Sequence, residues 1–487
     1  MTGYLLGVDV GTTAVKCALV ESSTRDVVAT TNVSTKSGVD CGAGRAEQAV
    51  EAILMATKEA IDGLPRDILG KISSIGICGQ MHGIVWWKAA EVGRAASLLM
   101  EGSSTSEAAA PWSRLITWED QRCSRTFLDE VDAKIKAAIS TEGSSLLSSG
   151  YGLASYAHML SMSPERLEGF DSCGTIHDLL AFLLCGYTSA TDATMDTTNA
   201  FSWGGFDIDK KTWNATAVKA LGISVELLPA VKTPGTIVGR IPETSIFKLP
   251  SDAPVYVPMG DHPCSVVSAI VQQDSDTSDG VTLVNIGTSA QLAMLLPAGG
   301  HDNTQSSTRG FEFRPFVNEH QLLGVAAALS GGNMFAWLVE RCQEWMQELT
   351  GDASISQSLV YERLIARGLD KRDTTLVFRP TLNGERSNSQ QTGFIDLLLL
   401  HNGSLGDLSA ALSKGLIQNL VEMAPEHLQE QLRTSRMIGT GNALLRNKLL
   451  QHFLQQQLDD PLLLALQDAA DAAVGAALVP VFLNLGK

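Results

Sequence analysis

A weak internal repeat constrains the fold of this chain more than any other feature. Asp9-Val10-Gly11-Thr12-Thr13 recurs in pattern as Asn285-Ile286-Gly287-Thr288-Ser289. In each copy an apolar run precedes the polar residue, and a second apolar run follows the hydroxyl residues, which predicts two β-hairpins. A motif that returns in the second half predicts two structurally related halves. Because helical and strand patterns alternate in both halves, the predicted class is α/β.

The two turns have the composition of phosphate-binding loops. Glycine allows a close approach of the backbone, and consecutive turn N–H groups form a concavity that binds anions. Either turn alone is explained equally well as a plain tight hairpin, whereas two equivalent copies favour phosphate binding. The predicted contacts in the first turn are Gly11, Thr12 and Thr13, and those in the second are Gly287 and Thr288.

The repeat differs at its first position, where Asp9 corresponds to Asn285. Magnesium bound to phosphates usually takes one or two carboxylates together with water. Asp9 is therefore the candidate metal residue, and Asn285 adds no second charge. No G-x-x-x-x-G-K-[ST] segment is present in the sequence, which excludes a P-loop.

Length and proline content predict two domains. The chain has 487 residues, and six prolines fall within residues 228–258. Prolines at this density mark connections between elements, so the predicted domains are residues 1–255 and 256–487. The segment 89–110, rich in Ala, Ser, Gly and Glu, is predicted to be a mobile surface insertion.

Net charge and cysteine spacing indicate which binding partners and which cellular compartment to expect. The formal net charge is −17, which argues against a nucleic-acid partner. The N-terminal residues resemble a strand rather than a signal peptide, and no apolar run is long enough to span a membrane. The eight cysteines include no C-x-x-C pair, so reduced thiols in a cytoplasmic protein are expected. The oligomeric state is left open between monomer and homodimer.

Further sequence blocks, in order along nearly the whole chain, carry a family resemblance. These blocks are Gly79-Gln80-Met81-His82-Gly83, Trp118-Glu119-Asp120-Gln121-Arg122, Gly260-Asp261, Ser330-Gly331-Gly332-Asn333, Gly439-Thr440-Gly441-Asn442 and Ala472-Ala473-Val474-Gly475-Ala476-Ala477. Together with the two turns, they resemble the FGGY carbohydrate kinases of the actin–hexokinase–Hsp70 superfamily. The resemblance implies two ribonuclease-H-like (actin-like ATPase) domains joined by a hinge, with ATP, Mg²⁺ and a sugar in the cleft between them.

Within that family the blocks are most similar to those of kinases that act on a seven-carbon ketose. Xylulokinases share the Gln-Met-His block, so a five-carbon ketose remains an alternative. Glycerol kinases have an Arg-Glu pair at this place, which argues for a ketose. A nucleotide-binding protein without kinase activity, like actin or an Hsp70 chaperone, is the contrasting alternative, but such proteins lack the Gln-Met-His and Gly-Asp blocks.

Asp261 is the candidate general base. It follows a short predicted strand and precedes a helix that begins at Pro263, so its carboxylate could reach a substrate hydroxyl. The competing interpretation is a helix cap, a position at which Asp is favoured. The resemblance favours the base, and it also places Asp261 beside Asp9 near the metal, through water.

The remaining candidates follow from the resemblance. The residues expected to contact the sugar are Gln80, Met81, His82, Glu119, Asp120 and Asp261 itself. The residues expected to contact ATP, besides the two turns, are Lys16, Gly331, Gly332, Gly439, Gly441, Asn442 and Arg446. A histidine after a buried strand is often only a core residue, and a lone lysine on a strand is usually solvated, so His82 and Lys16 depend on this context.

Overall fold

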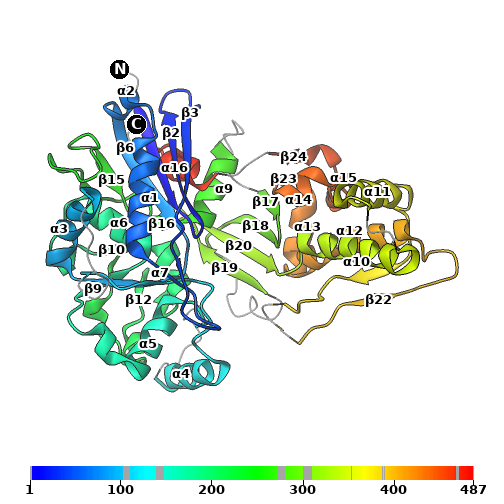
Figure 1. The fold of residues 1–487 in the computed structure, drawn as a ribbon, viewed down its shortest axis with the longest axis horizontal. Coiled ribbons are helices and arrows are strands. Elements are labelled where there is room, and N and C mark those ends of the chain that lie inside the picture. Colours follow the sequence, from blue (N-terminus) through cyan, green and yellow to red (C-terminus); the bar gives the residue numbers. More distant parts are fainter. Residues whose placement is uncertain are drawn as a thin grey trace. The chain divides into compact units, whose positions relative to one another are not determined.

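A computed structural model describes the chain except for residues 1–2, 103–109, 139–146, 272–279, 300–309, 352–353, 386–387, 389, 468–470 and 486–487. The described residues form two compact units of mixed α/β structure. Unit 1 comprises residues 1–274, 315–319 and 471–487, and unit 2 comprises residues 275–314 and 320–470. Figure 1 shows both with the sequence colour running from blue to red, and the red C-terminal helix α16 lies among the blue strands of unit 1.

The centre of unit 1 is a sheet with strand order β14-β15-β6-β1-β2-β3, to which β16 adds at β6. Strands β1 and β2 are antiparallel, and β1 and β6 are parallel. The seven strands are β1 (Tyr4–Val10), β2 (Ala14–Glu21), β3 (Val27–Ser34), β6 (Ile72–Gly79), β14 (Ile237–Arg240), β15 (Pro254–Tyr256) and β16 (Met259–Gly260).

Helices cover both faces of this sheet. Leu6, Val8 and Val10 pack in one core with helices α1 (Val50–Asp62) and α6 (Ile176–Leu184). The opposite face is covered by α16 (Ala472–Phe482), which packs on β1, β6 and α9 (Asp261–Val271). A Cβ at Gly7 would collide with the Ala473 carbonyl, so glycine lets α16 lie directly on the strand.

Unit 1 also contains shorter strands and further helices outside this sheet. Its short strands are β4 (Gly38–Val39), β5 (Glu47–Gln48), β7 (Val85–Trp87), β8 (Leu115–Ile116), β9 (Ser172–Gly174), β10 (Thr194–Asp196), β11 (Phe206–Asp207), β12 (Thr212–Trp213) and β13 (Ala230–Lys232). Its further helices are α2 (Arg66–Leu69), α3 (Ala89–Met100), α4 (Arg125–Ala138), α5 (Gly152–Met162), α7 (Thr197–Trp203) and α8 (Ala215–Ala220). Strands β4, β5 and β8 form a sheet of their own, which holds residues 47–48 in place.

Unit 2 has a six-stranded sheet with the order β19-β20-β18-β17-β23-β24. Its strands are β17 (Val281–Ile286), β18 (Ala290–Pro297), β19 (Phe311–Pro315), β20 (Gln321–Ala328), β23 (Arg436–Thr440) and β24 (Leu464–Leu466), beside the pair β21 (Val377–Arg379) and β22 (Phe394–Asp396). Its helices are α10 (Gly332–Thr350), α11 (Gln357–Asp370), α12 (Leu405–Glu422), α13 (Glu426–Thr434), α14 (Asn442–Arg446) and α15 (Lys448–Gln455). Apolar faces of α10, α11, α12 and α15 form its core with the sheet.

The predicted duplication is present in the strand topology. In each unit the repeated motif joins an antiparallel pair, β1–β2 or β17–β18, and the first strand of each pair is also parallel to a later strand, β6 or β23. Both predicted hairpins are therefore confirmed. The loops differ in length, because four residues lie between paired Val10 and Val15 but only three between Ile286 and Ala290.

Two expectations differ from the structure. The predicted boundary at residue 255 lies inside unit 1, because α9 packs against α16 and so stays with the first sheet. The segment 89–110 is also not wholly a surface insertion: residues 89–100 form helix α3, whose Ala89, Val92 and Ala96 are buried. Its apolar residues recur at helical spacing, so one face of the helix can be buried. The Ala- and Ser-rich composition of the segment obscured this pattern.

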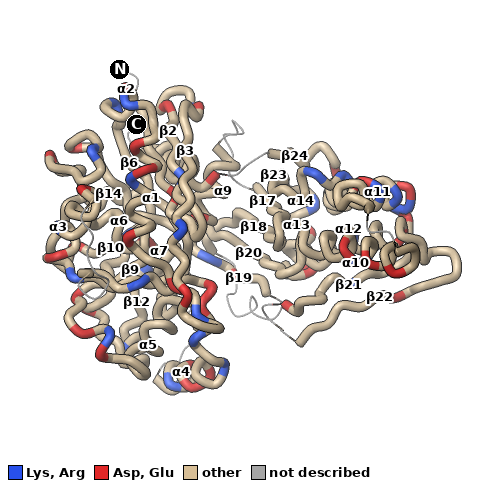
Figure 2. Tube along the Cα trace, viewed as in Figure 1, with Lys and Arg blue, Asp and Glu red and all other residues tan. Residues whose placement is uncertain are grey.

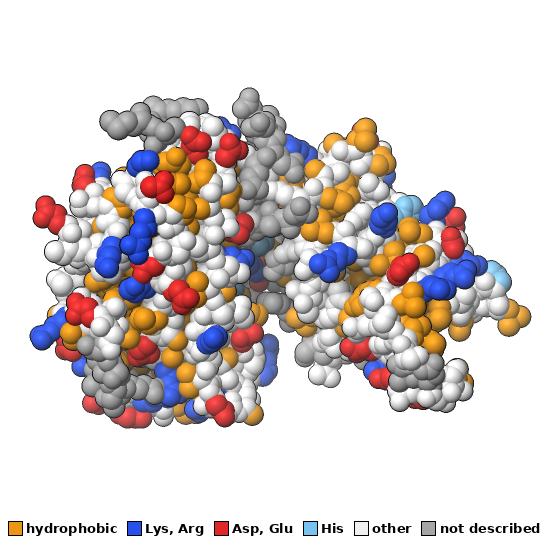
Figure 3. Space-filling model, turned by 45° about the horizontal axis from the view of Figure 1, so that its top comes forward, with side chains coloured by type: hydrophobic (Ala, Val, Ile, Leu, Met, Phe, Trp, Pro, Cys, Tyr) orange, Lys and Arg blue, Asp and Glu red, His pale blue; other side chains and the backbone are white. Residues whose placement is uncertain are grey.

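The surface mixes charges of both signs. Figure 2 shows Lys and Arg interspersed with Asp and Glu along each unit, and the face in Figure 3 carries small apolar patches between them. No helix in the described ranges is long and apolar enough to cross a membrane. The eight cysteines are free, and seven of them are buried.

Candidate active site

Asp9 ends strand β1 at the turn and faces the α16 side of the sheet. In the strand register it lies opposite Lys16 on β2 and beside Cys78 on β6. Its side chain is buried, and Oδ1 has no hydrogen-bond partner among the described residues. Burial raises the pKa of Asp9 to about 7, with a further rise from Asp261 and a smaller lowering by Lys16. A buried carboxylate oxygen without a partner marks a place where a ligand, water or cation belongs.

Asp261 opens helix α9 on the same unit and lies in the field of the same lysine. Its Oδ1 accepts a hydrogen bond from the His262 N–H at 2.7 Å. Burial raises the pKa of Asp261 to about 6, while the bond from His262 and the charge of Lys16 oppose the rise. The carboxylate thus contacts the helix start through one oxygen, and it lies close enough to Asp9 to raise the pKa of that residue. Asp261 is far from Asp9 and Lys16 in the sequence, and the fold brings it to them.

The first turn is fixed by side chains rather than by an unusual backbone. The Gly11 N–H donates to the Ala14 carbonyl at 3.0 Å, and Gly11 has no left-handed φ angle. The Thr12 hydroxyl accepts a bond from the Trp118 indole N–H at 3.0 Å and donates to Gln80 Oε1 at 3.3 Å. Thr13 is exposed at the tip. The predicted backbone freedom of Gly11 is therefore not used, and the turn is oriented through Thr12.

The Gln80-Met81-His82 segment follows strand β6 next to this turn. Gln80 is buried, and its amide is bonded to other side chains. Met81 packs over Gly260, where a Cβ would lie 2.6 Å from the Met81 sulfur. His82 has a left-handed φ of 75° and stacks on Tyr151 with ring centroids 4.5 Å apart. A left-handed non-glycine residue stores strain of the kind found at binding sites.

The bonding of His82 sets its tautomer. Nδ1 lies 2.7 Å from the Ser202 carbonyl oxygen, and a carbonyl only accepts, so Nδ1 carries the proton. In the neutral ring Nε2 is then the acceptor nitrogen. This arrangement suits recognition of a hydroxyl group, which can donate to Nε2.

The two neighbouring acids Glu119 and Asp120 have different surroundings. Asp120 is fully buried and accepts bonds from the Ala46 N–H, the Arg122 N–H and two guanidinium nitrogens of Arg122, all at 2.8–2.9 Å. Burial alone would raise the pKa of Asp120, but these bonds lower it. The four bonds engage both of its oxygens and hold the carboxylate in place, and the sugar contact of Asp120 remains a prediction.

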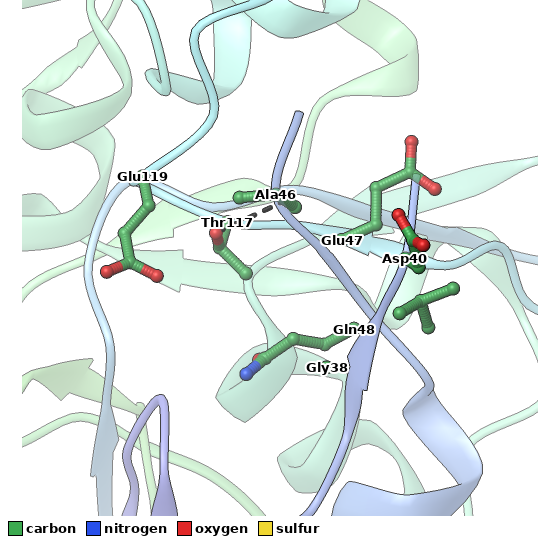
Figure 4. A pocket seen from close by; sticks show the side chains of 8 residues that line it. Gly38, Asp40, Ala46, Glu47, Gln48, Thr117 and Glu119 are labelled. Atoms are coloured by element: carbon green, nitrogen blue, oxygen red, sulfur yellow. Dashed lines mark hydrogen bonds between the residues drawn. The ribbon is translucent and has the colours of Figure 1, made fainter. Parts of the chain in front are cut away.

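Glu119, in contrast, is exposed and lines a hollow of about 290 Å³. The hollow is also lined by Gly38, Val39, Asp40, Ala46, Glu47, Gln48 and Thr117. Figure 4 shows Gln48 and Thr117 between Glu119 on one side and Asp40 and Glu47 on the other. Of the two acids, Glu119 is the one with room for a ligand.

In unit 2 the glycine blocks meet around the second turn. The Gly287 N–H donates to the Ser289 carbonyl at 3.0 Å, and the carbonyls of Gly287 and Thr288 accept from the N–H groups of Gly332 and Asn333. Gly441 has a left-handed φ of 94°, and a Cβ there would lie 2.5 Å from the Ile286 carbonyl oxygen. Only glycine permits both the conformation and the approach.

The remaining candidates of unit 2 surround this turn unequally. Gly331 donates its N–H to the Asn333 side chain and Gly332 donates to Gly287, so both N–H groups are bonded within unit 2, and the phosphate contacts of these glycines remain a prediction. Their observed role is to let helix α10 approach the turn. Gly439 lies on strand β23, Asn442 begins α14 with an exposed side chain, and Arg446 is exposed at the end of that helix.

Two residues near the site were not among the predicted ones. Gln48 is buried on strand β5 and contacts both the first turn and Gln80. Asp471 caps α16 through bonds from Ala473 and Val474, and its charge raises the pKa of Asp9. An Asp before an Ala-rich helix is a recognisable cap signal, whereas no local pattern marks Gln48.

Comparison with known proteins agrees with this fold. Residues 4–97 and 100–268 match the N-terminal domain of the FGGY family of carbohydrate kinases. The chain is 35% identical to a sedoheptulokinase from Homo sapiens over 99% of this chain and 98% of that protein. It is 23% identical to a xylulose kinase from Escherichia coli over 84% of this chain and 76% of that protein. A crystal structure of xylulose kinase from Rhodospirillum rubrum superposes with a TM-score of 0.77 at 18% identity, covering 99% of this chain and 90% of that one.

The chain therefore belongs to the FGGY family of carbohydrate kinases. It has the α/β, two-domain, actin-like fold of that family. As a kinase of this family it acts on a sugar, and the family implies ATP as the phosphoryl donor.

Proposed function

We propose that this protein transfers the γ-phosphoryl group of ATP to the terminal hydroxyl of sedoheptulose, giving sedoheptulose 7-phosphate and ADP. The observation that carries the proposal is the meeting of Asp9, Asp261 and Lys16 at one end of a sheet, in a chain that is 35% identical over its whole length to a sedoheptulokinase. Two carboxylates and one cation match the needs of phosphoryl transfer, which are a base, a metal holder and a phosphate contact.

In this proposal Asp261 is the general base. The sugar hydroxyl oxygen forms a bond to the γ-phosphorus, the bond from that phosphorus to ADP breaks, and the hydroxyl proton passes to the Asp261 carboxylate. A pKa of about 6 leaves Asp261 mainly deprotonated at neutral pH, yet more basic than an exposed aspartate. Lys16, opposite Asp9 in the strand register, would contact the transferred phosphate as a point charge.

Asp9 and Asp261 would hold Mg²⁺, through water. The unpartnered buried Oδ1 of Asp9 fits this role, and two carboxylates with water are a usual Mg²⁺ environment. When bound, the ion would offset the negative charge of the phosphate chain. No group of three or more His, Cys, Asp or Glu side chains suited to a metal occurs in the described part of the chain.

Sugar recognition would use Met81, His82 and Glu119, with Gln80 behind them. The Nε2 atom of His82 would accept from one hydroxyl group, the Glu119 carboxylate from another, and Met81 would form an apolar wall. In unit 2, Gly287, Thr288, Gly439, Gly441, Asn442 and Arg446 would lie along the nucleotide. Gly287 supports this placement, because a Cβ there would meet nothing within 4 Å and the turn is open in front.

A panel of ketoses at saturating MgATP tests the proposal directly. ADP release is coupled to a visible signal, and kcat/KM is compared for sedoheptulose, xylulose and other ketoses. We expect the highest value for sedoheptulose. A higher value for xylulose would instead support the five-carbon alternative, which the 23% identity to a xylulose kinase keeps in view. Absence of ketose-stimulated ADP release with every sugar would overturn kinase activity on a ketose.

A further inference from the structure

A closed ring of side-chain hydrogen bonds joins the first phosphate turn to the segment proposed to contact the sugar. The Thr12 hydroxyl donates to Gln80 Oε1 at 3.3 Å, and Gln80 Nε2 donates to Gln48 Oε1 at 2.9 Å. Gln48 Nε2 then donates to the Thr12 carbonyl oxygen at 2.6 Å, which closes the ring. Three segments far apart in the sequence are thereby linked, and Gln48 contributes two of the three bonds.

The ring has a fixed direction, set by Trp118. The indole Nε1–H of Trp118 only donates, and it donates to the Thr12 hydroxyl at 3.0 Å. The single hydroxyl proton of Thr12 is then directed to Gln80, and each later bond follows in the same sense. Because Trp118 precedes Glu119 and Gln48 lines the same hollow as Glu119, the ring borders the proposed sugar side.

Burial makes this ring an all-or-none device. Gln48 and Gln80 are 6% and 2% exposed, so water does not replace a lost partner. A buried polar network stabilises its geometry when it is complete and is costly when one member is unsatisfied. Strand β5, paired with β4 and β8, holds Gln48 in place. A shift at Trp118 or Gln80 therefore moves the Thr12 turn rather than being absorbed by Gln48.

We propose that Gln48 is a positioning residue that couples sugar binding to nucleotide binding. Contact of a ketose with the His82 and Glu119 region orders Trp118 and Gln80, which both bond to Thr12. Gln48 fixes the Gln80 amide and the Thr12 carbonyl relative to each other, so that this order reaches the phosphate turn. By linkage, the ketose raises the affinity for the nucleotide, and the nucleotide raises the affinity for the ketose by the same factor. This inference rests on the proposed function, because it takes a ketose and ATP as the two ligands.

The test compares nucleotide binding with and without sugar in three variants. Gln48→Met keeps the volume and removes both bonds, and Gln48→Glu keeps the acceptor for Gln80 but loses the donor to Thr12. Thr35→Val is the matched control, since the Thr35 hydroxyl donates to the same Thr12 carbonyl at 3.3 Å but lies outside the ring. The affinity for a non-hydrolysable ATP analogue is measured by calorimetry, with and without the ketose that gives the highest kcat/KM. Thermal unfolding of each variant checks the fold.

We expect the ketose to tighten analogue binding at least about fivefold in the wild type and in Thr35→Val. The factor should fall below about twofold in both Gln48 variants, while the affinity measured without sugar changes little. If Gln48→Met does not fold, Gln48→Glu decides the question. Coupling that persists in a folded Gln48 variant, is absent from an active wild type, or is lost equally in Thr35→Val overturns the inference alone. A wild type that phosphorylates no ketose overturns the proposed function, and the inference with it.

Discussion

The two glycine turns share a topology but differ in charge. Asp9 lies opposite Lys16 in unit 1, and at the same register positions of unit 2 Asn285 lies opposite Gln291. Unit 1 thus has a buried carboxylate opposite an ammonium group in the strand register. Unit 2 has two neutral amides at these positions, and Asn285 is exposed. The duplicated hairpin supplies two similar turns, and only the first has the acids and the cation for metal and proton chemistry.

The turns are also held in different ways. Side chains of Gln48 and Trp118 reach the Thr12 turn from other elements. The second turn is instead held by backbone groups, because N–H groups of α10 donate to its carbonyls and Gly441 lies against Ile286. A turn held by side chains can respond to what binds those side chains, whereas one held by packed backbone is a rigid support. We therefore expect the turn of unit 1 to respond to ligands and the turn of unit 2 to act as a rigid support.

The largest expected effect is on turnover in Asp261→Asn. Loss of a general base typically costs about 10²–10⁴-fold, and we expect about 10³-fold in kcat. Asparagine keeps an oxygen for the His262 N–H, so the helix start and the fold should survive. Steady-state kinetics and calorimetry with an ATP analogue measure both parts. Near-normal kcat in a folded variant would remove Asp261 from the chemistry and weaken the contrast between the units.

A second prediction concerns the metal and compares equivalent positions. Asp9→Asn should weaken the apparent affinity for Mg²⁺ by about 10–100-fold, because a charged oxygen beside the cation is lost. Asn285→Ala, which removes no charge, should leave the Mg²⁺ dependence of the rate unchanged. Titration of Mg²⁺ at fixed ATP gives both values. Equal shifts in the two variants would mean that both turns handle the metal.

These contrasts also show what the sequence could and could not predict. The hairpins and the acid at Asp9 were visible, because β-forming runs, glycine and a polar residue are local signals. The unit boundary was not, because residues 471–487 return to unit 1 by packing of α16 on β1. The different surroundings of Glu119 and Asp120 depend on where the Arg122 side chain turns, which no local pattern shows. Gln48 was missed because its partners Thr12 and Gln80 are distant in sequence.

A third prediction uses the raised pKa of Asp9 and concerns stability against pH. The group ionises near pH 4 when unfolded but near pH 7 when folded, so the folded state holds the extra proton between these values. Stability therefore falls as pH rises from about 4 to about 7. Asp9→Asn removes this dependence, and at pH 8 without Mg²⁺ it should be more stable than the wild type by about 2 kcal/mol.

Denaturant unfolding at pH 4 and pH 8 measures the difference in free energy of unfolding between Asp9→Asn and the wild type. This difference should be small at pH 4. The matched control is Asn285→Asp, which adds a carboxylate at the exposed position of unit 2. For Asn285→Asp the change in free energy of unfolding should stay within about 0.5 kcal/mol at both pH values, as for ordinary surface substitutions. A pH-dependent change as large as that at Asp9 would show that the two turns have the same burial in solution.

The smallest predicted effect separates the turn glycines themselves. A Cβ at Gly11 would lie 3.0 Å from the Ala14 carbonyl oxygen, whereas a Cβ at Gly287 would meet nothing within 4 Å. Neither glycine has a left-handed φ, so alanine introduces no backbone strain at either place. We expect Gly11→Ala to lower the free energy of unfolding by about 1 kcal/mol and Gly287→Ala to change it by less than about 0.5 kcal/mol. If Gly287 is kept for ligand access, Gly287→Ala should still weaken binding of the ATP analogue, and unchanged binding would leave that glycine with no role in the second turn.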